Sequence, residues 1–246
     1  MIARIARSPL LLGGAFLVAA GLGAALFAGV QAMTPGGGDR GRIEGVVRAY
    51  ILDHPEILPE AMARLQDKEN AKVIAPNRAA FVTPFPGAEV GNPKGDVTIV
   101  AFLDYACGYC RASLPALAQI VARDPKVRIV YREFPVLGEE SMVAARWALA
   151  AAEQGKFKPF HDALYAGGQV TEAGIRDAAD KVGLDKARAA RDAYSPKVEA
   201  EIAANHRLGQ MLRVSGTPAW VIGDRVIPGV TDYESFADAV RRAREG

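Results

Sequence analysis

Cys107 and Cys110 are the only cysteines in this 246-residue chain, and two residues separate them in the stretch FLDYACGYC. Such a pair serves a metal site, a structural disulfide or reversible thiol-disulfide exchange. A zinc site usually needs four ligands, and the histidines, His54, His161 and His206, lie far apart without ligand spacing. A disulfide closing so short a loop adds little stability. The spacing therefore favours a redox pair, which needs no metal and no separate cofactor because the disulfide stores the electrons.

The elements expected around the pair assign different roles to the two thiols. Residues 97–103 form a continuous apolar run rich in β-branched residues, typical of a strand covered on both faces, and residues 110–122 follow helical spacing. Cys107 would then lie where a helix begins, and the unpaired N–H groups and dipole of that helix favour a thiolate. Cys110, one turn later, would be more buried and would resolve the mixed disulfide. Gly108-Tyr109 is the dipeptide expected to tune the redox state.

The remaining pattern predicts an α/β fold, a small sheet interrupted by helices. Residues 127–134 return to strand character, so strand, helix and strand form a βαβ unit with a parallel sheet. An alanine-rich helical block follows over about 139–213. The chain returns to β structure at 219–222 and 226–227, and a closing helix begins at Tyr233.

The N-terminus combines basic residues with a long apolar run. Arg4 and Arg7 precede an uncharged stretch over 10–30, longer than the roughly 7–15 residue core of a cleaved signal and close to the roughly 20 residues that cross a bilayer. Small residues at 30–32 also suit a signal peptidase. Residues 1–33 are therefore expected to be a signal peptide or a membrane anchor. In both cases the rest of the chain is exported, and we expect it in the periplasm.

Between this segment and the main domain, two regions have different compositions. Residues 34–41 are glycine-rich and predict a flexible linker. Residues 42–75 predict two short amphipathic helices, interrupted at Asp53-His54-Pro55. Their apolar faces need cover, either on the protein's own core or against a second copy, and spacing alone leaves both open. Residues 76–246 are expected to form the main domain.

Taken together, these motifs resemble the DsbA family of thioredoxin-fold thiol-disulfide oxidoreductases. The resemblance covers roughly residues 76–246 and rests on the cysteine pair after a buried strand, the inserted helices, and Thr217-Pro218 before the last hairpin. By base rate the bond before Pro218 would be trans, since only about 5–6% of such bonds are cis. The resemblance instead implies a cis Pro218 beside Cys107, with the backbone of Thr217 pairing with the extended chain of a substrate.

Three stretches, FLDYACGYC, YREFPVLG and RIEGVVRAYILDHPEIL, look closest to the branch that includes the ScsC suppressor proteins. In that branch the helical prefix serves oligomerisation, and some members isomerise wrong disulfides. The resemblance therefore implies a homo-oligomer formed through residues 42–71. It also implies protein substrates with thiols or disulfides. The membrane redox partner would be a DsbB-like, quinone-linked protein for an oxidase, or a DsbD-like or ScsB-like reducing protein for an isomerase.

One position departs from the family pattern. Relatives often carry an acidic residue six positions before the first cysteine to handle the proton of the buried thiol, and here that position is Ala101. Asp104 or Glu133 could replace it, although Asp104 is expected to cap or turn the chain and Glu133 to pair with an arginine. Solvent water is the remaining route.

Three rings near the expected site also have ordinary structural interpretations. Tyr105 and Trp220 could line a substrate groove, but aromatic residues beside a sheet are more often core. His161 is expected on a helix surface rather than as a catalytic base.

One alternative of a different class is a non-enzymatic module that binds copper(I) through the same thiolates, because soft sulfur ligands suit this ion. Against it, no methionine cluster or histidine lies near the pair in sequence. Nucleic acid is not an expected partner, because 30 Lys and Arg against 28 Asp and Glu leave no basic excess.

Overall fold

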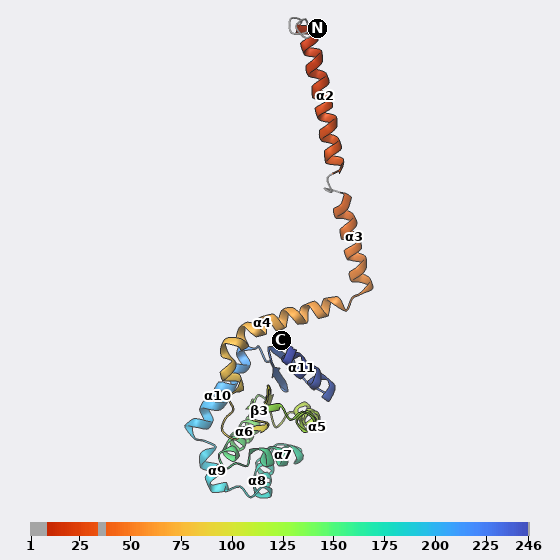
Figure 1. Ribbon diagram of the computed structural model, residues 1–246. Coiled ribbons are helices and arrows are strands. Elements are labelled where there is room, and N and C mark those ends of the chain that lie inside the picture. Colours follow the sequence, from red (N-terminus) through yellow and green to blue (C-terminus); the bar gives the residue numbers. More distant parts are fainter. Residues whose placement is uncertain (1–8, 34–37, 246) are drawn as a thin grey trace. The chain divides into compact units, whose positions relative to one another are not determined.

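The computed structural model describes residues 9–33 and 38–245 of the chain (Figure 1). The chain divides into two compact units, Met1–Met62 and Ala63–Gly246. The helix α4 belongs to both, because it runs from Ile57 to Val82. Each unit is described separately below.

The described residues of the first unit are mostly helical. Helix α2 spans Pro9–Met33, and within the described residues it is the helix long and apolar enough to cross a membrane, over Gly13–Val30. A signal sequence has the same properties, so α2 fits either form of the expected N-terminal segment. Helix α3 spans Gly38–Asp53 and so begins inside the expected linker, whose residues 34–37 lie outside the described part of the chain.

Helix α4 carries the chain into the second unit. It continues through Pro76, so the expected domain boundary at residue 76 falls inside a helix, and the boundary itself stays a prediction. On the turn that contains Pro76, the side chain of Asn77 donates to the Val73 carbonyl at 2.8 Å. Ile74 and Phe81 of this helix are buried against the sheet, which explains why the helix persists where the sequence suggested an end.

A five-stranded mixed sheet forms the centre of the second unit, in the order β1-β3-β2-β4-β5. The pair β2 and β3 is parallel, as the sequence predicted, and the other three pairings are antiparallel. The short edge strand β1 was not predicted. The strands are β1 (Glu89–Gly91), β2 (Val97–Leu103), β3 (Val127–Glu133), β4 (Ala219–Ile222) and β5 (Arg225–Pro228).

The predicted insertion is present as five helices between β3 and β4. Helix α5 connects β2 to β3, and α11 closes the chain. The bounds are α5 (Gly108–Arg123), α6 (Glu139–Ala152), α7 (Phe157–Ala166), α8 (Glu172–Lys181), α9 (Lys186–Asp192), α10 (Pro196–Met211) and α11 (Tyr233–Glu245).

Strand β2 has a hydrophobic cluster on each face. Ile99, Ala101 and Leu103 belong to the larger cluster, whereas Val100 and Phe102 belong to the second one, with α4 and the end of α10. Because successive side chains of a strand point to opposite faces, a strand covered on both sides must be apolar throughout. This double burial fixes the strand that leads directly into the cysteine pair.

Candidate active site

Cys107 lies at the N-cap of α5, directly after the loop that follows β2. Its backbone is extended, with φ −82° and ψ 112°, and its Sγ accepts a hydrogen bond from the backbone N–H of Cys110 at 3.3 Å. Both cysteines are free thiols, 5% and 0% exposed respectively. Since an N-cap side chain faces the unpaired N–H groups of the first turn, the structure places Cys107 where the sequence predicted it.

Thr217 and Pro218 lie beside this sulfur. The Cys107 thiol contacts the Thr217 carbonyl oxygen at 3.2 Å, and the Thr217–Pro218 peptide bond is cis. The base-rate expectation of a trans bond was therefore wrong, and the geometry implied by the resemblance is present. The antiparallel register of β2 with β4 pairs Phe102 with Ala219. The loop after β2 and the loop before β4 therefore lie at the same end of these two strands. Residues 110 positions apart in the chain meet there.

The Gly108-Tyr109 dipeptide and Cys110 differ sharply in solvent exposure. Tyr109 is 70% exposed, and open space surrounds the position where a Cβ on Gly108 would lie. Cys110, by contrast, is fully buried, and burial raises the pKa of its thiol well above the usual range. Cys110 is therefore protonated at neutral pH in the reduced form.

Asp104 holds the loop before the cysteines in place. It is 1% exposed, and its carboxylate accepts hydrogen bonds from the backbone N–H groups of Ala106, Val136 and Leu137 at 2.8, 2.8 and 3.0 Å. The Ser141 hydroxyl donates at 2.6 Å. The expectation that Asp104 caps a turn is confirmed. The four hydrogen bonds that its carboxylate accepts connect the loop after β2 to the loop after β3.

Glu133 and His161 lie in a buried chain with Tyr105. The Tyr105 hydroxyl donates to Glu133 at 3.2 Å and lies 3.1 Å from Nδ1 of His161. Burial raises the pKa of Glu133 well above its usual range and lowers that of His161 to about 3.

Two expectations about these residues were wrong. Glu133 bonds a tyrosine rather than an arginine, and His161 is 1% exposed, surrounded by aromatic rings rather than at the surface. Tyr105 is core.

Trp220 is also core, fully buried, and it contributes to a second support of the site. Its indole N–H donates to the Gly229 carbonyl at 3.0 Å, while the Gly229 N–H donates to the Pro218 carbonyl at 2.8 Å. The Thr231 N–H donates to the Ser113 hydroxyl at 3.3 Å, which in turn donates to the Tyr109 carbonyl at 3.1 Å.

These bonds join the cysteine helix to the loop that supports Pro218. Ser113 and Thr231 were not predicted from the sequence, because nothing in their types or spacing relates residues 118 positions apart.

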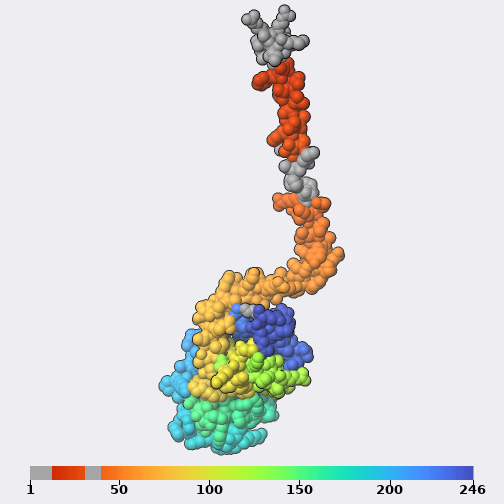
Figure 2. All heavy atoms as spheres, in the orientation of Figure 1, coloured from red at the N-terminus to blue at the C-terminus, as the bar shows by residue number. Residues whose placement is uncertain are grey.

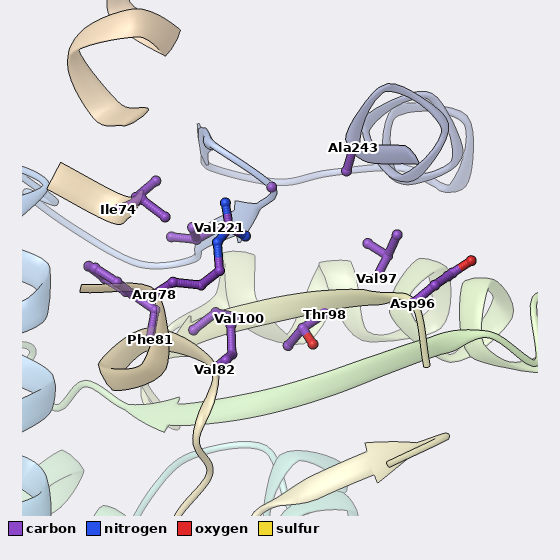
Figure 3. Close-up of a pocket in the computed structure, with 11 residues that line it drawn as sticks. Ile74, Arg78, Phe81, Val82, Asp96, Val97, Thr98, Val100, Val221 and Ala243 are labelled. Atoms are coloured by element: carbon purple, nitrogen blue, oxygen red, sulfur yellow. The ribbon is translucent and has the colours of Figure 1, made fainter. Parts of the chain in front are cut away.

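The cavity drawn in Figure 3 lies away from this site. It is lined by residues at the start of β2, among them Val97 and Thr98, together with Arg78 of α4 and Ala243 of α11. Since the cysteines follow the other end of β2, this cavity does not contact them. Among the described residues, no group of three or more His, Cys, Asp or Glu side chains could hold a metal ion.

With this geometry in hand, comparison with known proteins gives the family. Residues 98–241, more than half of the chain, match the DSBA-like thioredoxin domain. The chain belongs to the DsbA-like thioredoxin family. Residues 39–72, upstream of the DsbA-like domain, match the N-terminal domain of the copper resistance protein ScsC.

Solved structures agree with this assignment and confirm the α/β thioredoxin-like fold with inserted helices. A thioredoxin-like oxidoreductase from Silicibacter pomeroyi DSS-3 is 45% identical, with a TM-score of 0.67, and the match covers 69% of this chain and 99% of that one. A linker-deletion mutant of Proteus mirabilis ScsC is 26% identical, with a TM-score of 0.65, over 86% and 98% of the two chains.

A Na(+)/H(+) antiporter from Salinispora tropica is also related, at 30% identity over 156 residues. This match covers 62% of the present chain and 24% of the antiporter. The DsbA-like chain thus spans about a quarter of the length of that relative.

Proposed function

We propose that this chain is a thiol-disulfide oxidoreductase that forms, reduces or isomerises disulfide bonds in exported protein substrates. The observation that carries the proposal is the position of Cys107, at the start of α5, 3.3 Å from the amide nitrogen of Cys110 and 3.2 Å from the Thr217 carbonyl. Amide donors at a helix N-terminus favour a thiolate, the form that exchanges with disulfides.

In the oxidising direction, a substrate thiolate attacks Cys107 of the Cys107–Cys110 disulfide. The bond between the two cysteines breaks, Cys110 leaves as a thiolate and takes a proton, and a mixed disulfide joins Cys107 to the substrate. A second substrate thiolate attacks the substrate sulfur of that bond and releases Cys107. The substrate has then lost two electrons to the cysteine pair. The high pKa of Cys110 favours its protonation once it leaves.

In the isomerising direction, the reduced pair starts the reaction. The Cys107 thiolate attacks a wrong substrate disulfide, which frees a substrate thiolate and forms the mixed disulfide. Another substrate thiolate displaces Cys107, so a different disulfide forms without net electron transfer. Thr217, whose carbonyl already contacts Cys107, would pair with the extended substrate chain in both directions.

Self-association through residues 42–71 forms part of the proposal. Eight large apolar side chains in this stretch are at least half exposed within their own unit or on α4: Ile43, Val46, Val47, Tyr50, Leu52, Leu58, Met62 and Leu65. Burial of apolar area is the main driving force for association. The match of residues 39–72 to the ScsC N-terminal domain gives this surface a counterpart in a relative.

The location and redox partner follow from the apolar helix and the chemistry. Export past α2, by cleavage or anchoring, would place the thiols in the periplasm, where disulfides persist. A quinone-linked membrane protein would reoxidise an oxidase, whereas a reducing membrane protein would serve an isomerase. A reduction potential near about −120 mV, measured in glutathione buffers, would assign the oxidising direction, and one near or below about −200 mV the isomerising or reducing one.

Trapping the mixed disulfide tests the reaction. The full-length protein, purified in detergent and then oxidised, is mixed with a reduced, unfolded protein that has two cysteines. The wild type should oxidise this substrate. Cys110→Ser, supplied with an oxidised substrate, should accumulate a covalent complex on non-reducing gels, because the resolving thiol is gone, whereas Cys107→Ser should form none. Turnover by Cys107→Ser would contradict the proposal. Stoichiometric copper(I) retention lost in Cys110→Ser, without turnover, would favour the copper alternative.

A further inference from the structure

A pocket with a volume of about 470 Å³ lies beside Thr217 and Pro218. One wall comes from α4, through Gln66 and Asn70, and the rest comes from the loop over 212–217 and from β5. Pockets that bind ligands typically measure about 300–1,000 Å³, so this one has room for a large side chain. It adjoins the segment that contacts the reactive sulfur, whereas the pocket of Figure 3 does not.

The α4 wall is fixed to the hairpin of β4 and β5. Asp67 pairs with Arg225 at 3.0 Å, both partners about 30% exposed, and Arg78 pairs with Asp224 at 2.7 Å. Figure 2 shows yellow-orange atoms of this stretch beside blue atoms of the C-terminal part, as these pairs require. These two ion pairs attach the wall to the hairpin of the domain that holds the cysteines.

One buried polar atom on this pocket has no hydrogen-bond partner. Asn70 is 4% exposed, and its Nδ2 is buried and unpaired, while its Oδ1 accepts from Gln66 Nε2 at 3.0 Å. The Thr217 hydroxyl is also buried, but it faces the Cys110 thiol. Buried polar groups are nearly always paired in native proteins, so the unpaired Asn70 amide indicates a site that is completed by a ligand.

The position of the pocket restricts that ligand to the substrate chain. In a mixed disulfide the Cα atoms of the two joined cysteines lie about 4.4–6.8 Å apart, so the residues that flank the substrate cysteine pass over the segment around Thr217. In an extended chain successive side chains point to opposite sides, and one of each pair of neighbours faces the protein.

We propose that this pocket receives a side chain of the substrate next to its reacting cysteine and selects one that ends in a carbonyl or carboxylate oxygen. The inference rests on the proposed function. Asn70 Nδ2 supplies the donor, and Gln66, whose side chain is exposed, turns outward to open it. Arg213, exposed at the pocket with a left-handed φ of 54°, adds positive charge that favours glutamine or glutamate over lysine.

The test compares exchange rates of two peptide disulfides with that of oxidised glutathione. The peptides are identical except that a residue flanking the cysteine is glutamine in one and leucine in the other. Reduced full-length protein in detergent should react about tenfold faster with the glutamine peptide, the effect expected of one buried hydrogen bond. Asn70→Leu should abolish this preference, so that the two peptides react at similar rates. Asn77→Leu, on the same helix but outside the pocket, should keep the preference.

Asn70→Asp provides a second variant of the same size as the native residue. It replaces the donor by an acceptor and should favour a lysine peptide over the glutamine peptide. A wild type that exchanges with glutathione but prefers neither peptide overturns the pocket inference and leaves the proposed function intact. An Asn70→Leu variant that keeps the preference for the glutamine peptide has the same meaning. A wild type that does not exchange even with glutathione overturns the proposed function, and the inference with it.

Discussion

At the scale of single residues, the site depends on buried polar groups that take no part in thiol-disulfide exchange. Asp104 joins two loops through four donors, and Tyr105 joins Glu133 to His161. Such groups are stable inside a protein only when they are paired or neutral. Burial keeps the His161 ring neutral, which makes this residue a source of pH dependence.

We expect His161→Phe to change how stability depends on pH. Burial lowers the pKa of His161 from 6.5 to about 3 in the folded state, so below pH 6.5 the unfolded chain binds the proton more readily. The stability contribution of the neutral ring is complete above pH 6.5 and is lost as the pH falls toward 3. A phenylalanine suits the aromatic surroundings formed by Tyr131 and Phe157.

The measurement is urea unfolding at pH 7 and pH 4.5. The wild type should lose more stability than the variant between these values, by about 1.4 kcal/mol for each pH unit at most from this group. Parallel losses in both proteins would show that His161 titrates normally in the fold.

At the scale of elements, Arg132 on β3 anchors the end of α4. Its guanidinium is 3% exposed and donates to the carbonyls of Ala80, Phe81 and Thr83 at 2.7, 3.0 and 2.5 Å. It also pairs with Glu201 of α10 at 2.7 Å. The last carbonyls of a helix lack partners within the helix, so Arg132 satisfies part of the end of α4, and Arg128 donates to the Val82 carbonyl at 2.9 Å. Both side chains fix this end to β3.

Replacing this residue should therefore be costly. Arg132→Met leaves the buried Phe81 carbonyl and Glu201 without their partner, and we expect a loss of about 3–5 kcal/mol in the free energy of unfolding. Arg78→Met removes an exposed ion pair from the same helix and should cost less than about 1 kcal/mol. Chemical denaturation of both variants measures the difference, and equal losses would contradict the anchoring role.

Local patterns explain which parts of the fold were predictable. The apolar run of β2 and the helical spacing after Cys110 indicate a strand and a helix directly, because the pattern of apolar residues reflects which faces of an element are buried. The three-residue strand β1 and the continuation of α4 past Pro76 depend on distant partners, namely β3 and Arg132. The pairing of Ser113 with Thr231 and the wall that Asn70 adds also arise only in the folded chain, since no local pattern links residues so far apart.

At the scale of the whole molecule, the proposed self-association would use the exposed apolar side chains of α3 and the start of α4. A single-chain oxidase has no need of such a surface, whereas several active sites joined in one assembly suit the repeated exchange of an isomerase. The same surface would otherwise favour aggregation, because large apolar patches are rarely left uncovered.

Val47→Asp should therefore reduce the number of protomers in solution. The side chain is half exposed on α3, and a charge there would be buried without a partner in any assembly. Arg48→Glu changes charge on the same helix without removing apolar surface and should leave the assembly intact. Light scattering of the detergent-purified chains, corrected for bound detergent, measures the mass. Equal protomer numbers in wild type and Val47→Asp would contradict self-association through this face.

The hydrogen bond between Ser113 and Thr231 also has a consequence for the order in which the protein is built. Ribosomes make chains from the N-terminus, so the two cysteines are synthesised more than a hundred residues before Thr217 and Thr231. Until those residues arrive, no neighbouring carbonyl faces Cys107 and nothing supports Pro218. The helix N-terminus at Cys107 can therefore form early, but the Thr217 carbonyl and the support of Pro218 join the site only when residues 217–231 have entered the fold.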